Sequence, residues 1–159
     1  MPRYVAYDFF RSVPRPRPVD EDCSEDYTSM MALNGKVVVV TGGFGQLGLA
    51  VVQAALLAGA RVAALGRSAA PADVKTLSGA LVISDVDLAY PEAAARALDE
   101  VAAKLGRLDA LVNVAGTFRW EKLAGGSVDT WDLLYRVNLR TAVSASRAAL
   151  PHLLRSGGG

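Results

Sequence analysis

After residue 33 the hydrophobic positions fall into short apolar runs that alternate with longer amphipathic segments. The runs are KVVVVT (36–41), RVAALG (61–66), ALVIS (80–84) and LDALVNVAG (108–116). KVVVVT, which is rich in β-branched residues, suits a strand buried on both faces of a parallel sheet. We therefore expect these runs to form the strands of one sheet.

Helical periodicity fills the segments between and after these runs. Helices are predicted over GQLGLAVVQAALLAG (45–59), PEAAARALDEVAAKLG (91–106) and SVDTWDLLYRVNLRTAVSASRAALPHLL (127–154). Gly59 and Gly106 suit helix ends, and Pro91 suits a helix start. For the last helix, Ser127 or Asp129 is the expected N-cap, with closure near Pro151 and the final glycines. Strands that alternate with helices indicate an α/β fold with helices on both faces of the sheet.

The first thirty residues have a different character. They hold four of the seven prolines, no glycine and the acidic run VDEDCSED, without a helical or strand period. We predict a flexible extension over 1–32 and one domain over 33–159. An arm that binds a partner is disfavoured because acidic residues outnumber the nearby arginines, and a true translation start at Met30 or Met31 is a further alternative.

Composition narrows the function classes. The net charge is +1 with no basic run, which argues against nucleic acid or an anionic membrane surface as a partner. Cys23 is the only cysteine, so an internal disulfide or a cysteine-built zinc site is excluded, and no metal site is expected. Without a signal-like leader or a long apolar stretch, a soluble cytoplasmic protein is the expectation.

A glycine cluster connects the first strand to the first helix. Gly43-x-Gly45-x-x-Gly48 has the context that the dinucleotide fingerprint requires. Such glycines allow a tight turn and bring backbone N–H groups and the positive end of the helix dipole to a pyrophosphate. The cluster therefore predicts a dinucleotide site.

Four strings occur in an order and spacing that resemble the short-chain dehydrogenase/reductase family: TGGFGQLG, DLAYPE, GRLDALVNVAG and WDLLYRVNL. The resemblance spans 34–159. It implies a Rossmann-type, doubly wound parallel sheet, incomplete at about four strands, in the order 3-2-1-4. It also implies an NAD(P)(H)-dependent oxidoreductase that transfers hydride between nicotinamide and a small-molecule alcohol or carbonyl, and a full-length homo-oligomer (dimer or tetramer). Gln46 replaces a glycine of the classical pattern, which leaves the classical and extended subfamilies open.

The resemblance also assigns cofactor contacts. The glycine turn receives the pyrophosphate, the acidic pair after the third strand receives the adenine, and the end of the fourth strand receives the nicotinamide ribose. The residues implied are Gly42, Phe44, Gly45, Gln46, Leu47, Gly48, Asp87, Leu88, Asn113, Ala115 and Gly116. Asp85 competes with Asp87, either of these two can instead cap its loop, and Asn113 can instead stabilise a turn.

The end of the second strand bears on the choice between NADP and NAD. An acidic residue that binds the ribose 2′-hydroxyl is expected about twenty residues after the glycines. Gly66 stands there instead, followed by Arg67, whose guanidinium suits a 2′-phosphate. NADP is therefore preferred, with NAD possible, and a solvated arginine is the alternative.

Four further polar or aromatic positions bear on the prediction. Asn138 matches the family asparagine that holds a water in the proton relay, and a buried amide that ties the helix to its neighbour is the alternative. His152 is expected to be a surface or capping residue. Trp120 and Trp131 are expected to pack, although the loop of Trp120 is also a candidate border of the substrate site.

The family's catalytic Tyr-x-x-x-Lys and its upstream serine have no match. None of the five tyrosines has a lysine four positions later. We therefore expect an N-terminal portion, truncated before the fifth strand, that binds cofactor and is inactive by itself. A non-catalytic dinucleotide-binding or partner-binding module is the alternative, and the reading frame beyond Gly159 distinguishes the two.

Overall fold

The computed structural model of the protein describes residues 33–71 and 75–157, so the predicted N-terminal extension lies outside the described residues. The elements follow the predicted alternation. They are β1 (Val37–Thr41), α2 (Gln46–Leu57), β2 (Arg61–Leu65), the 3₁₀ turn η3 (Lys75–Gly79), β3 (Ala80–Ile83), α3 (Pro91–Leu105), β4 (Ala110–Asn113), α4 (Val128–Leu134), the π-helical η4 (Tyr135–Arg140) and α5 (Thr141–Ser156).

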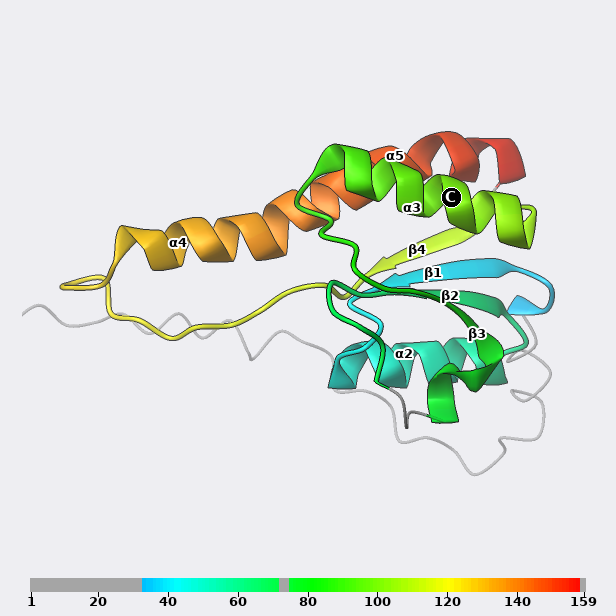
Figure 1. Ribbon diagram of the computed structural model, residues 1–159, viewed down its shortest axis with the longest axis horizontal. Coiled ribbons are helices and arrows are strands. Elements are labelled where there is room, and N and C mark those ends of the chain that lie inside the picture. Colours follow the sequence, from blue (N-terminus) through cyan, green and yellow to red (C-terminus); the bar gives the residue numbers. More distant parts are fainter. Residues whose placement is uncertain (1–32, 72–74, 158–159) are drawn as a thin grey trace, which may run out of the picture.

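The four strands form one sheet in the order β3-β2-β1-β4, and every pairing is parallel. Both the expected strand order and the Rossmann-type architecture are confirmed. Helix α2 covers one face, and α3 and α5 lie side by side on the other (Figure 1). β1 is buried along its whole length because it lies between two strands and beneath helices on both faces.

Alternate residues of each strand enter two separate cores. Val37 and Val39 of β1 face the core under α3 and α5, where they meet Leu98 of α3. Val38 and Val40 face the core under α2, where they meet Val52. A strand with branched apolar residues at every position suits this arrangement, because both of its faces are removed from water.

All four strands end at the same level. Thr41 of β1 is paired with Leu65 of β2 and with Asn113 of β4, and Leu65 is paired with Ile83 of β3. The segments that follow the strands therefore meet at one edge of the sheet. We call this edge, made by the ends of the strands and residues 42–48, 66–67, 84–88 and 114–117, the carboxyl edge.

The two ends of the last predicted helix agree with the structure. Ser127 is its N-cap, with Oγ accepting from the Asp129 amide at 3.2 Å, as one of the two alternatives held. The helix passes through Pro151 and continues to Ser156, with Gly157 as its C-cap, so the closure predicted at the final glycines is confirmed. Its last turn is held from outside, because Ser156 Oγ donates to the Leu108 carbonyl at 2.6 Å.

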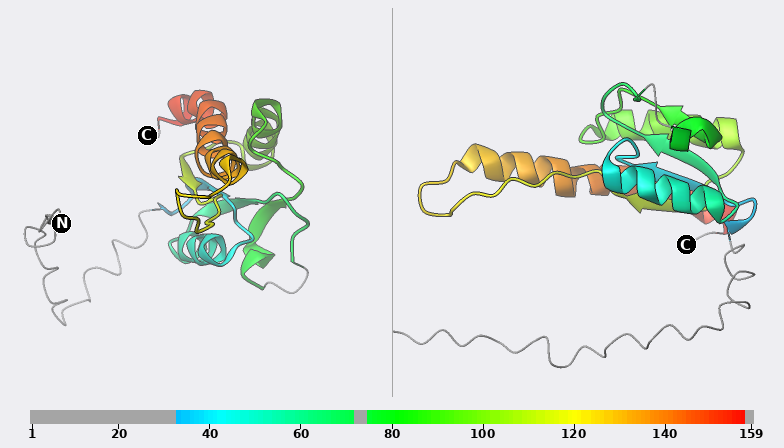
Figure 2. Two further views of the ribbon diagram at one scale, coloured as in Figure 1. Left: turned by 90° about the vertical axis from the view of Figure 1, so that its left-hand side faces the viewer. Right: turned by 90° about the horizontal axis from the view of Figure 1, so that it is seen from below.

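The interior of this helix differs from the prediction, because a π-helical stretch, Tyr135–Arg140, lies between α4 and α5. α4 and the loop before it project beyond the sheet as an arm (Figures 1 and 2). Trp120 and Trp131 lie on this arm with 72% and 52% of their surface exposed, so the expectation that they pack is wrong. Within the arm the Ser127 amide donates to Glu121 Oε1 at 2.7 Å, which lowers the pKa of that carboxyl.

His152 is not a surface residue. Only 9% of it is exposed, and Nε2 lies 2.9 Å from Asp99 Oδ1 of α3. Its Nδ1 is 2.7 Å from an Arg155 nitrogen, which is always a donor. Nδ1 therefore accepts and Nε2 carries the proton, so His152 is a structural link between α3 and α5.

No helix in the described part of the chain combines the length and the apolar character needed to cross a membrane.

Candidate functional site

The turn after β1 is pressed against the loop after β4. Gly42 has a φ of +64°, and a Cβ there would lie 2.8 Å from both the Cα and the N of Ala115. A Cβ on Gly48 would collide with the Gly42 carbonyl. The sequence therefore needs glycine at Gly42 for conformation and at Gly48 for close approach, as the dinucleotide fingerprint supposes.

The amino end of α2 opens onto this turn. Its N-cap is Gly45, and no side chain caps this helix start. The first turn of α2, which lies wholly within the described residues, contains no acidic residue. Gln46 and Leu47, the first two helical residues, are exposed. A helix start with uncapped amides and no carboxylate nearby attracts an anion.

The end of β2 carries Gly66 and Arg67. The Gly66 amide donates to the Ile83 carbonyl at 3.1 Å, and the Gly66 carbonyl accepts from Val86 at 3.0 Å. The ring of Phe44, from the glycine turn, lies directly against Gly66. Arg67 is exposed at the carboxyl edge, next to that ring contact.

After β3, Asp87 uses both of its carboxylate oxygens. Oδ1 accepts from the Ala89 amide at 3.0 Å, so the loop-capping alternative holds for Asp87. Oδ2 lies 2.9 Å from an Arg136 nitrogen, and that guanidinium stands 5.3 Å from the centroid of the Tyr90 ring. Leu88 is buried, and Asp85, with a φ of +59°, is exposed in the turn before it.

β1 and β4 are the strands between which the connections change face. Thr41 Oγ1 accepts from the amides of Val114 and Ala115, each at 3.1 Å, and so ties the two strand ends together. Asn113 Nδ2 donates to Ser146 Oγ of α5 at 3.1 Å. In open α/β sheets this switch point is where ligands bind.

Asn138 lies in the π-helical stretch and reaches the loop after β4. Its Oδ1 accepts from the Thr117 amide at 2.8 Å and would touch a Cβ on Gly116. The side-chain amide of Asn138 thus ties the helix to its neighbour, as the structural alternative for this residue predicted, but the residue is exposed and not buried. A π-helical turn frequently occurs at functional sites, because the extra residue redirects the side chains beside it.

Every predicted site residue therefore lies at the carboxyl edge or beside it. Two neighbours were missed from sequence: Thr41 and Arg136. Thr41 carried a usable signal, since a polar residue that ends a buried strand needs a partner. Arg136 carried none, because its partner Asp87 is 49 positions away in the chain.

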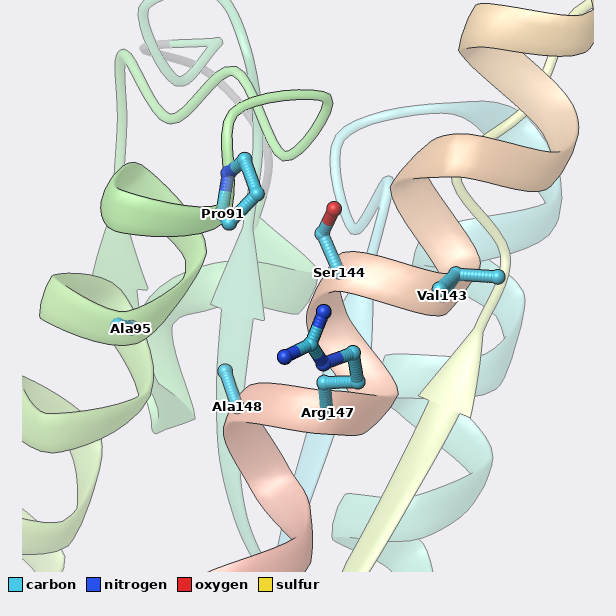
Figure 3. A pocket seen from close by; sticks show the side chains of 6 residues that line it. All are labelled: Pro91, Ala95, Val143, Ser144, Arg147 and Ala148. Atoms are coloured by element: carbon cyan, nitrogen blue, oxygen red, sulfur yellow. The ribbon is translucent and has the colours of Figure 1, made fainter.

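The described residues also form a pocket between α3 and α5. It is lined by Pro91, Ala95, Val143, Ser144, Arg147 and Ala148 (Figure 3). None of the predicted cofactor residues lines it, so the pocket is separate from the carboxyl-edge site.

Comparison with known proteins agrees with this geometry. The family model described as short chain dehydrogenase matches residues 36–159. D-threitol dehydrogenase of Mycolicibacterium smegmatis is 35% identical over 132 residues, covering 80% of this chain and 51% of the relative. Meso-2,3-butanediol dehydrogenase of Serratia marcescens is 32% identical over 131 residues, covering 80% of this chain and 52% of the relative. The chain thus spans about half the length of these relatives.

A solved structure shows the same fold. The aldohexose dehydrogenase of Thermoplasma acidophilum, in ligand-free form, superposes with a TM-score of 0.70 at 28% identity, covering 79% of this chain and 47% of that one. The matched family model includes all four strands and the helices that cover them. The chain belongs to the short chain dehydrogenase family.

Proposed function

We propose that the carboxyl edge binds a nicotinamide dinucleotide, with NADP preferred over NAD, and serves hydride transfer to or from a small-molecule alcohol or carbonyl. The observation that carries the proposal is the glycine turn beneath the uncapped start of α2. Four of the seven residues from 42 to 48 are glycines, and the first-turn residues Gln46 and Leu47 are exposed. These features fit the anionic part of a dinucleotide.

The remaining predicted residues divide the ligand between them. Gly42, Phe44, Gly45 and Gly48 belong to the pyrophosphate end, and Arg67 is assigned to a 2′-phosphate. Asp87 and Leu88 are assigned to the adenine. Asn113, Ala115 and Gly116, beside the β1–β4 switch point, are assigned to the nicotinamide ribose. Arg136 is paired with Asp87 at 2.9 Å and so fixes the position of the carboxylate at this end of the proposed site.

The bound dinucleotide supplies or accepts the hydride. The described residues bind and orient it, and Asn138 holds the loop after β4 through the Thr117 amide, which lies where the reactive ring is expected. The sequence has no Tyr-x-x-x-Lys, so we assign proton transfer to none of its tyrosines. The substrate class is proposed from relatives whose names include D-threitol and meso-2,3-butanediol dehydrogenases.

A charge at the start of α2 tests the site. Gln46→Glu changes one exposed side chain with little change of shape and places a carboxylate beside the proposed pyrophosphate. Because a carboxylate in the first turn favours the helix dipole, thermal stability should hold or rise while NADPH affinity falls about tenfold. Gln53→Glu, an exposed residue farther along α2, is the matched control. Fluorescence titration with NADPH measures both, and equal affinities for the two variants would refute the site.

A further inference from the structure

The Phe44 ring occupies the space in which a side chain at position 66 would begin. The three atoms nearest to an ideal Cβ on Gly66 are Cγ, Cδ2 and Cε2 of Phe44, all of them well inside contact distance. Phe44 itself is partly buried and packs against the core under α2 that contains Val40 and Ala64. Moving the ring away from Gly66 would therefore disturb its packing against this core.

Space, and not backbone conformation, is what requires glycine here. Gly66 is not among the glycines with a positive φ. Its amide and carbonyl are both bonded to the β3 side, at 3.1 Å to Ile83 and 3.0 Å to Val86, and the preceding Leu65 carbonyl accepts from Gly43 at 2.9 Å. The backbone on either side is thus fixed, so a side chain at position 66 must displace the ring.

Position 66 is also where a dinucleotide fold places the acidic residue that binds the ribose 2′-hydroxyl. We propose that Phe44 is a specificity-determining residue: its ring excludes any carboxylate from position 66 and so leaves Arg67 as the side chain that meets the 2′ position. The choice between the two dinucleotides then rests on Arg67, because the ring keeps position 66 free of the carboxylate that would favour an unmodified 2′-hydroxyl. This inference rests on the proposed function for its ligand, but the contact between ring and glycine can be tested without any ligand.

The first experiment measures thermal stability in a double-mutant cycle. Gly66→Ala should lower the melting temperature by several degrees in the native background, and should cost little in the Phe44→Ala background, where the space is free. Leu57→Ala, which removes an exposed apolar side chain from α2, is the control background and should leave the full cost of Gly66→Ala. An equal loss in all three backgrounds overturns the inference, and so does a failure of Gly66→Ala to fold in both the native and Phe44→Ala backgrounds.

The second experiment titrates NADPH and NADH. Gly66→Asp alone should weaken NADPH without strengthening NADH, because the ring blocks the carboxylate. Phe44→Ala/Gly66→Asp should bind NADH about tenfold more tightly than Gly66→Asp, as expected for a hydrogen bond to a charged group. A gain of NADH affinity by Gly66→Asp alone, equal to that of the double variant, overturns the inference. Failure of the native chain to bind either dinucleotide overturns the proposed function instead, and the stability cycle then decides on the contact.

Discussion

Asp109 is a buried carboxylate at the end of the sheet opposite the carboxyl edge. Oδ2 accepts from the Val37 amide at 2.9 Å and from Arg107 Nε at 2.8 Å, and Lys36 lies 3.5 Å from Oδ1. Burial acts to raise the pKa of Asp109, but the hydrogen bonds from Arg107 and Val37 and the charges of Arg107 and Lys36 outweigh it and hold the pKa below 3.8. The carboxylate thus joins the start of β1 to the start of β4.

This lowered pKa predicts a loss of stability in acid. A group with a folded pKa below its unfolded value stabilises the fold above the unfolded pKa, and the contribution is lost as the pH falls through the folded value. Asp109→Asn should therefore lower the free energy of unfolding by about 2 kcal/mol at pH 7. Below about pH 4, the free energy of unfolding should decrease less with falling pH in the variant than in the native protein. Urea titrations from pH 3 to pH 7 measure this. The exposed Asp132→Asn serves as control, and a match between the two variants would contradict the assignment.

Arg67 carries the charge part of cofactor preference. It is exposed at the end of β2, so its substitution should leave the fold intact. Arg67→Asp should weaken NADPH by at least about tenfold more than NADH, because a like charge replaces a charge-assisted hydrogen bond to the 2′-phosphate. Arg96→Asp, at an exposed arginine of α3, controls for the change in net charge. Fluorescence titration of both cofactors decides, and equal losses would leave Arg67 as a solvated side chain.

Among the elements, the π-helical stretch is the one that joins the helix layer to the site. Thr141 Oγ1 donates to the Val137 carbonyl at 2.6 Å, which satisfies a carbonyl in the part of the helix where the regular ladder is displaced. Asn138 and Arg136 both leave the helix within this stretch, one toward Thr117 and one toward Asp87. One irregular turn therefore contacts two of the loops at the carboxyl edge.

The Asn138 contact should control local opening of the loop after β4. Asn138→Ala removes the acceptor of the Thr117 amide, so that amide should exchange with solvent faster while global stability falls by about 1 kcal/mol or less. Asn138→Asp retains an acceptor oxygen and should restore most of the protection. Hydrogen exchange followed by NMR resolves the two variants, and unchanged exchange at Thr117 in Asn138→Ala would show that another contact holds the loop.

Taken as a whole molecule, the chain presents apolar side chains along its projecting arm and last helix. Trp131, Tyr135, Leu139 and Val143 recur at four-residue intervals and are 48–60% exposed. Side chains of this kind in one series are typical of surfaces covered by a partner. We propose that a second copy of the chain covers them, which agrees with the homo-oligomer expected from the sequence.

Charge at the middle of this series should separate the copies. Leu139→Glu should shift the protein toward monomer, since a carboxylate enters the apolar contact and is desolvated there. Leu57→Glu places the same charge at an exposed leucine of α2, on the other face of the sheet, and should leave the assembly unchanged. Light scattering after gel filtration gives the masses. A monomeric native protein, or dissociation by both variants, would contradict the proposal.

The sequence by itself determined the elements whose causes are local. Four short apolar runs indicated the four strands, although only β1 and β2 are largely buried and the edge strands β3 and β4 are half-buried. Pro91 with Gly106 marked α3 to the residue, because these signals act within a few positions of the chain. The glycine turn was found for the same reason. The candidate site was predicted to the extent that it follows strand ends, and parallel pairing brings those ends to one level.

The tertiary structure decided what depends on partners distant in sequence. His152 of α5 is paired with Asp99 of α3, 53 positions earlier, and the last turn of α5 donates from Ser156 to the Leu108 carbonyl, 48 positions earlier. Likewise, the need for glycine at position 66 comes from a ring 22 positions away, with no trace in the backbone conformation. Propensity and spacing report local free energies, whereas these features arise from contacts that exist only once the sheet and helices have packed.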